Sequence, residues 1–171
     1  ANEDLPYEAW QKEGLLTICK GDYVDYSHVY DWYLKQSKKY SISLITYDPA
    51  NAFRLTNDLQ AYGGEAWTKV VRQGALTLSP ALKDIKELLL DGRVVFNNNR
   101  LFRWYLNNVK LVDDRNGNWL PTKQGRYRKI DGFAAWLNAH TETMKLMTII
   151  KESGGGVGFI SVKDLLKGGN T

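Results

Sequence analysis

The sequence has 171 residues, of which 43% are hydrophobic, 12% are aromatic and 25% are charged. This composition is typical of globular proteins, and the length suits one domain with a sizeable core. The aromatic content argues against a disordered chain. No apolar run approaches the ~20 residues of a membrane-spanning helix, so we expect no membrane partner.

The balance of charged residues and the small number of Cys and His residues further restrict the classes of function that are possible. Lys and Arg exceed Asp and Glu by 23 to 19, a mild excess that is compatible with a polyanionic partner without requiring one. Cys19 is the sole cysteine, which excludes an intrachain disulfide and a cysteine zinc cluster. Because His28 and His140 are the only histidines, a metal site would be built mainly from oxygen ligands.

The first half of the chain alternates between predicted strands and helices. Apolar, β-branched runs predict strands, and apolar residues at helical spacing behind a capping residue predict helices. Asp25 is the expected cap of the first helix. The predicted elements are a strand at 15–19, a helix at 26–39, a strand at 42–47, a helix at 50–62 and a strand at 68–71.

The second half begins with Ser79-Pro80, a pair typical of a helix start, and contains an Asn116-Gly117 step typical of a hairpin turn. The predicted elements are a helix from 79 to 91, a strand at 93–96, a helix at 99–107, a hairpin of 109–113 with 119–122, and a helix at 127–150. Residues 151–171 are rich in glycine and predict a flexible tail. Strands that alternate with helices predict an α/β domain with a partly parallel sheet.

Asp48 directly follows the most apolar of the predicted strands. In open α/β sheets, ligands gather beyond the carboxyl ends of the strands, so a carboxylate here would stand on a rigid element beside a crevice. An Asp followed by Pro49 is also a good helix start by itself. The residues alone leave both interpretations open.

Asp131 lies near the start of the predicted long helix. At about 100° per residue, it falls at the edge of the apolar stripe, where Ala135 and Asn138 continue the edge and leave room beside the carboxylate. An acid at this position is also stabilised by the dipole of the helix, which is the alternative interpretation. The apolar stripe consists of Ile130, Ala134, Leu137 and Met144.

Two carboxylates from separate elements that border one crevice could bind Mg²⁺ or Mn²⁺, because these ions take oxygen ligands and often only one or two carboxylates. A pair of such ions would activate water and stabilise the leaving oxygen in phosphodiester cleavage. Four basic residues just before Asp131 suit contacts to a DNA backbone, with a solvated charge cluster as the alternative. These residues are Lys123, Arg126, Arg128 and Lys129.

Several short patches, in order over residues 7 to 144, resemble the nuclease domain of the terminase large subunit of tailed bacteriophages. The order and spacing of the patches carry the resemblance, because each patch is weak alone. The patches are YEAW at 7–10, GLL at 14–16, GDYVDY at 21–26, ITYDPANA at 45–52, RQG at 72–74, LSP at 78–80, NRLFRW at 99–104, NNV at 107–109 and KIDGFAA at 129–135. Arg100 stands where the family usually has Pro.

The resemblance implies an RNase H-like fold, in which helices flank a mixed sheet, and a metal-dependent DNA endonuclease. Such an enzyme cuts concatemeric viral DNA when packaging starts and when the head is full, in the host cytoplasm. By position, Asp48 corresponds to the acid at the end of the inner strand and Asp131 to the acid on the C-terminal helix, on two Mg²⁺ or Mn²⁺ ions. The implied partners are double-stranded DNA, the terminase ATPase domain, the small terminase subunit and the portal.

One departure from the family is the expected first strand, which carries another essential Asp. No segment before Tyr7 is long enough for it, so we expect residues 1–150 to be a nuclease domain without its first strand and without the ATPase domain, followed by the tail at 151–171. A non-catalytic DNA-binding or docking module of the same fold is the alternative function. The patches at 45–52, 72–74 and 129–135 argue against a different RNase H-like nuclease.

Overall fold

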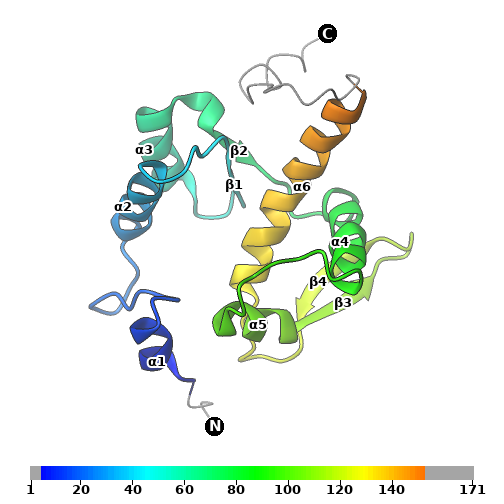
Figure 1. The fold of residues 1–171 in the computed structure, drawn as a ribbon, viewed down its shortest axis with the longest axis horizontal. Helices are drawn as coiled ribbons and strands as arrows, with labels where there is room; N and C mark the ends of the chain where they lie inside the picture. The colour runs from blue at the N-terminus through cyan, green and yellow to red at the C-terminus, as the bar shows by residue number, and fades with distance from the viewer. Residues whose placement is uncertain (1–4, 153–171) are drawn as a thin grey trace.

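The structure, a computed structural model, describes residues 5–152. Its long helix α6 (Asp131–Glu152) crosses the molecule between two groups of elements (Figure 1). One group contains α2 (Tyr26–Ser37), α3 (Phe53–Gly63), β1 (Ile45–Tyr47), η1 (Glu65–Trp67) and β2 (Thr68–Val70). The other contains α4 (Ala75–Leu90), α5 (Arg100–Asn107), β3 (Val109–Asp113) and β4 (Trp119–Lys123), while α1 (Tyr7–Lys12) precedes both groups.

The predicted mixture of helices and strands is confirmed, but the strands do not form one sheet. β1 and β2 pair in parallel, with Tyr47 opposite Val70, and β3 and β4 form a separate antiparallel hairpin. The described residues therefore contain two two-stranded sheets in place of the single mixed sheet that the resemblance implied. Among them, no helix is both long and apolar enough to cross a membrane. The tail predicted at 151–171 begins inside α6, and residues 153–171 lie outside the described residues.

Two predicted strands are wrong. Residues 15–19 and 93–96 have no regular structure, and Val95 is 85% exposed. A short apolar run becomes a strand only where a neighbour takes its backbone hydrogen bonds, and neither run pairs with a strand within residues 5–152. The sequence analysis also missed α1, whose buried Trp10 packs against Trp104 of α5 with ring centroids 5.6 Å apart.

Helix starts are confirmed where a side chain caps the first turn. Asp25 accepts a hydrogen bond from the backbone of Ser27, and Asn99 accepts one from the backbone of Phe102. In contrast, α4 begins one turn before Ser79, so Pro80 lies inside the helix. The buried face of α4 extends to Leu78, and burial of this face favours the earlier start over the local preference of Pro.

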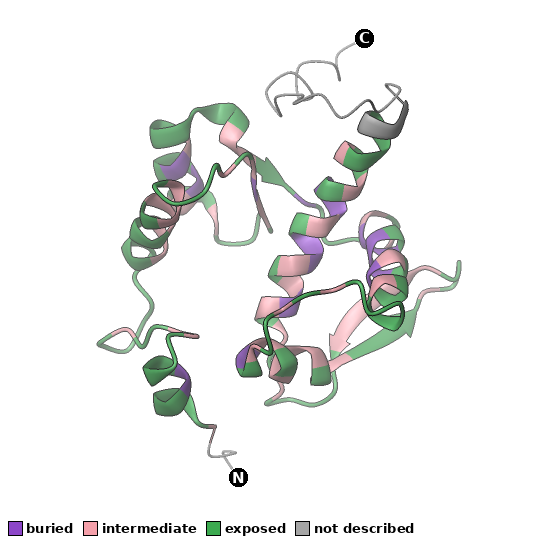
Figure 2. Ribbon diagram, viewed as in Figure 1, coloured by how far each residue is buried: buried purple, intermediate pink, exposed green. Residues whose placement is uncertain are grey.

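The core lies where α4 packs against the middle of α6. Its buried residues come from both helices and from the segment after β2 (Figure 2). The hairpin is attached to the same core, because the backbone N–H of Trp119 donates to the buried Ser79 hydroxyl at 3.0 Å. These contacts make α6 a rigid base for the candidate site. The core residues are Val71, Leu78, Ala81, Leu82, Ile85, Phe133 and Leu137.

Candidate functional site

Asp48 immediately follows β1 and is exposed. Its Oδ1 accepts a hydrogen bond from the backbone N–H of Ala50 at 2.9 Å, which closes a local turn. α3 begins only at Phe53, and its first turn receives no side-chain cap. The interpretation of Asp48 as a helix cap is therefore wrong, because the N-cap residue of α3 is Ala52.

Asp131 is the first residue of α6 and is exposed. The chain before it is held by Asn108, which is 1% exposed and donates through Nδ2 to the carbonyl of Lys129 at 2.8 Å. Behind it, Gly132 lies so close to Tyr105 that a Cβ atom would come within 2.4 Å of the ring. Burial raises the pKa of Tyr105, and the nearby negative charge of Asp131 raises it further. The start of α6 is therefore fixed on both sides of the carboxylate.

One face of α6 runs from Asp131 through Ala135 and Asn138 to Glu142, at spacings of four, three and four residues. β1 packs against α6, and the far part of this face is contacted by Lys69 of β2 and by Gln73 of the segment after β2. Asn138 and Glu142 are buried there, whereas Ala135 and Asp131 are exposed. The face is therefore open on the side where Asp131 stands, and the small Ala135 leaves room beside the carboxylate as expected.

Two contacts define how the parallel strands lie along α6. Lys69 forms a salt bridge to Glu142 at 2.8 Å, and Gln73 donates a hydrogen bond to Asn138 at 3.0 Å. From the first contact to the second, the residue number rises from 69 to 73 on the strand side and falls from 142 to 138 on α6. β2 therefore runs toward the amino end of the helix, and β1 does too because it is parallel to β2. The end of β1, with Asp48, thus points in the direction in which Asp131 lies.

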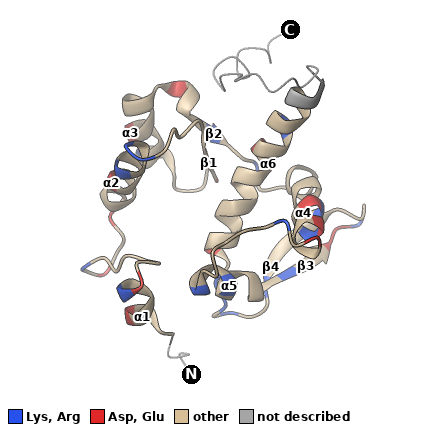
Figure 3. Cartoon of the chain, in the orientation of Figure 1, with Lys and Arg blue, Asp and Glu red and all other residues tan. Residues whose placement is uncertain are grey.

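The four basic residues predicted to contact DNA lie on the end of β4 and the loop that leads into α6. Lys123, Arg126 and Lys129 are exposed, and Arg128 is half-buried. Figure 3 shows further Lys and Arg positions, coloured blue, along α5, beside the amino end of α6. The structure thus brings the four basic residues into one segment next to Asp131, and their contact with DNA stays a prediction.

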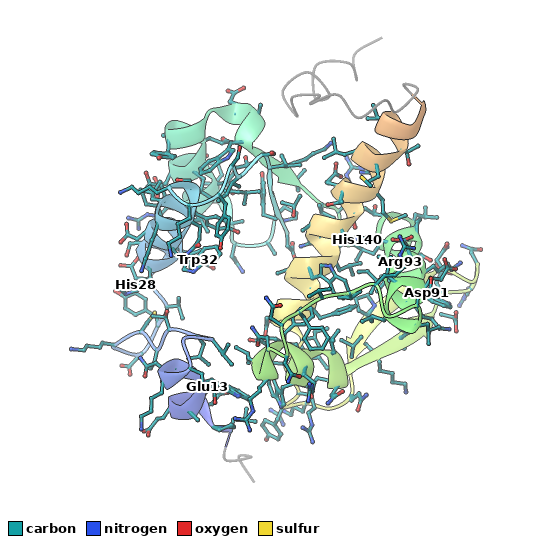
Figure 4. The ribbon with its side chains drawn as sticks, viewed as in Figure 1. Glu13, His28, Trp32, Asp91, Arg93 and His140 are labelled. Carbon is teal, nitrogen blue, oxygen red and sulfur yellow. The ribbon has the colours of Figure 1, made fainter. Side chains whose placement is uncertain are left out.

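Neither Asp48 nor Asp131 belongs to a preformed cluster of metal-binding side chains in the described residues. Among the described residues, no group of three or more His, Cys, Asp or Glu side chains is arranged to hold a metal ion. A hollow of about 760 Å³ lies elsewhere, between residues 14–24 and α2, where His28 and Trp32 line it (Figure 4). His140, the other histidine, contacts Asp84 of α4 at 2.6 Å. Metal binding by Asp48 and Asp131 therefore stays a prediction.

Three amide side chains support the elements that carry Asp48 and Asp131, and the sequence analysis gave no role to Asn108 or Gln73 and expected Asn138 only to leave room beside Asp131. Asn108 fixes the segment before Asp131, and Gln73 and Asn138 join the end of β2 to α6. The available signals were the RQG and NNV patches and a polar Asn138 at the edge of an apolar stripe. Those signals could have selected the three amides as candidate residues. They could not have identified the hydrogen-bond partner of each amide, because the partners come from distant parts of the sequence.

Glu142 predicts a measurable dependence of stability on pH. Burial raises the pKa of this carboxyl, but hydrogen bonds and charges from Lys145 and Lys69 outweigh burial and lower the pKa below the ordinary value of 4.5. A carboxyl with a lowered pKa stabilises the fold above its ordinary pKa, and this stabilisation is lost as pH falls through the lowered value. We therefore expect Glu142→Gln to lose less stability than the wild type in urea unfolding between about pH 6 and about pH 3. Equal losses in the two proteins would contradict this role.

Known proteins that are similar to this chain indicate its family. Residues 1–146 match the family model described as the terminase large subunit, endonuclease domain. The terminase large subunit of Enterobacteria phage HK97 is 28% identical over 130 residues, which cover 76% of this chain and 26% of that protein. The chain thus spans about a quarter of the length of this relative.

The fold agrees with the same relative. The crystal structure of the HK97 bacteriophage large terminase aligns with a TM-score of 0.72 and 26% sequence identity, over 80% of this chain and 29% of that chain. The family model covers most of the sequence, and the order of patches identified above lies within the matched range. The chain therefore belongs to the family of terminase large subunit endonuclease domains.

Proposed function

We propose that this domain is a divalent-metal-dependent endonuclease that hydrolyses phosphodiester bonds of concatemeric phage DNA at the start and the end of packaging. The observation that carries the proposal is the placement of two carboxylates on separate, rigid elements. Asp48 follows a strand that points toward the amino end of α6, and Asp131 is the first residue of that helix. Both Asp48 and Asp131 are exposed.

The donor set fits Mg²⁺ or Mn²⁺. Both candidate ligands are carboxylates, and Mg²⁺ in proteins is commonly bound by one or two carboxylates, with water and phosphate completing its shell. Two bound ions would supply an activated water and a stabilised leaving oxygen. Asp48 and Asp131 would hold these ions, and the exposed Asp131 would approach a DNA strand without entering a cavity.

The basic segment before α6 would position the DNA. Lys123, Arg126 and Lys129 present their charges to solvent next to Asp131, with Arg128 partly buried among them. Contacts of this kind to phosphates fix the register of a duplex and raise its local concentration without reading its sequence. We therefore propose that the choice of cutting site comes from the other parts of the packaging machinery: the terminase ATPase domain, the small terminase subunit and the portal, acting in the host cytoplasm.

Nicking of supercoiled plasmid tests the proposal directly. We expect the chain to convert supercoiled DNA to the open circle in Mn²⁺ and to lose this activity when the metal is removed with a chelator. Binding of the plasmid without cleavage in Mn²⁺ would contradict the proposal and would favour a DNA-holding module. Cleavage that persists in the chelator would contradict the assigned metal dependence.

A further inference from the structure

A chain of three hydrogen bonds connects the end of β1 to α6. The carbonyl of Tyr47 accepts from the backbone N–H of Val71 at 2.8 Å. The carbonyl of Val71 accepts from Nε2 of Gln73 at 2.8 Å, and the same Nε2 donates to Oδ1 of Asn138 at 3.0 Å. Asp48 is the residue after Tyr47, so this series of hydrogen bonds begins next to one of the two candidate metal ligands.

This chain of hydrogen bonds ends on the face of α6 that carries Asp131. Asn138 lies seven residues after Asp131, which in an α-helix places the two side chains about 20° apart around the axis and about 10.5 Å apart along it. Asn138 is 7% exposed, and it is the last covered residue on this face before the open part. Among the side-chain hydrogen bonds and salt bridges that join β2 and the segment after it to this face in the described residues, the contact with Gln73 is therefore the one nearest Asp131.

The chemistry of Gln73 suits this function. An amide nitrogen carries two protons, and here one is directed to the end of β2 and the other to α6. Two other contacts hold the strands to α6: β1 packs directly against the helix, and Lys69 of β2 forms a salt bridge to Glu142, one turn farther from Asp131. Both Lys69 and Gln73 are exposed, but the longer Lys69 side chain has more conformational freedom to lose, so its salt bridge restrains the strands less firmly than the shorter amide does.

From these contacts, and resting on the proposed function, we propose that Gln73 is a positioning residue. Its amide holds the carboxyl ends of the parallel strands, and with them Asp48, against the face of α6 that carries Asp131. The side chain touches neither acid, and it acts by fixing how far apart their two elements lie. Loss of this bridge removes neither carboxylate, but it lets the distance between their two elements vary and so weakens their ability to share an ion.

The test compares Gln73→Met with Gln60→Met. Gln60 is a matched control, because its Nε2 also makes a hydrogen bond that anchors β2, to Thr68 Oγ1 at 2.8 Å, but at the amino end of the strand. Binding of Mn²⁺ is followed by the electron paramagnetic resonance signal of the free ion, and folding by thermal unfolding. We expect Gln73→Met to weaken Mn²⁺ binding by about 10- to 100-fold and Gln60→Met to change it less than about twofold, with similar losses of Tm.

A second pair of variants separates the bridge from general damage. Asn138→Ala removes the acceptor, and the double variant with Gln73→Met should bind Mn²⁺ no more weakly than either single variant, because both changes remove the same contact. Equal Mn²⁺ affinity in Gln73→Met and Gln60→Met, while Asp48→Asn and Asp131→Asn lose the ion, would overturn this inference and leave the proposed function intact. Retained Mn²⁺ binding in both Asp variants would overturn the proposed function, and the inference with it.

Discussion

Replacement of either acid by its amide, Asp48→Asn or Asp131→Asn, should lower Mn²⁺-dependent nicking by at least about 100-fold. Changes to groups that merely support metal ligands typically lower affinity or activity by 10- to 100-fold, so loss of a ligand charge should have at least that effect. Asn keeps the shape of Asp and a carbonyl oxygen. In Asp48→Asn that oxygen can still accept from the backbone of Ala50, which preserves the turn.

The control for this prediction is Asp91→Asn. Asp91 is an exposed acid at the end of α4, and it makes no contact with β1 or with the amino end of α6 in the part of the chain that the structure describes (Figure 4). We expect its nicking rate to equal that of the wild type, and all three variants to unfold within about 0.5 kcal/mol of the wild type. Unchanged nicking by both Asp48→Asn and Asp131→Asn would refute the assigned site.

Leu137→Ala should cause the largest loss of stability. Leu137 is 1% exposed and belongs to the core in which α6 packs against α4. Removal of a fully buried leucine side chain leaves a cavity and lowers the free energy of unfolding by about 2–5 kcal/mol. Because Leu137 precedes Asn138, this core also determines which face of α6 meets Gln73.

Urea unfolding measures the effect, with Leu90→Ala as the control. Leu90 ends the same helix, α4, that Leu137 packs against, but it is 76% exposed, so its replacement should change the free energy of unfolding by no more than about 0.5 kcal/mol. A loss below about 1 kcal/mol for Leu137→Ala would show that α4 and α6 do not share a tightly packed core.

Local signals predicted the parts of the fold that depend on near neighbours. The predicted cap at Asp25 acts over two residues, and the hairpin turn predicted from Asn116-Gly117 is closed by Asp114, which accepts from the backbones of Asn116 and Asn118. Each of these contacts is complete within its own segment. The sequence therefore predicts them without knowledge of the rest of the chain.

Elements that depend on distant partners were predicted less well. The runs at 15–19 and 93–96 have apolar residues suited to strands, but no strand of the described residues pairs with them. The start of α4 was placed at Ser79 because Ser-Pro is a good local start, whereas the buried face that includes Leu78 extends the helix to Ala75. In each case tertiary packing overrides the local preference.

In the candidate site, too, features with a local signal could be predicted from the sequence and contacts between distant residues could not. Asp48 and Asp131 could be selected from the sequence because one follows a strand and the other opens a helix. The bridge from Gln73 to Asn138 joins residues 65 positions apart, and outside the site the contact of His140 with Asp84 joins residues 56 apart. Contacts over such separations depend on how the elements pack, so no local pattern predicts them.

The most direct measurement is a crystal structure of the chain grown with Mn²⁺, with the ion located by its anomalous scattering. We predict a Mn²⁺ peak at roughly 2.0–2.4 Å from carboxylate oxygens of both Asp48 and Asp131, with the two carboxylates within roughly 4–8 Å of each other. Two carboxylates farther apart than this with no ion between them would contradict the claim that these acids share a metal centre.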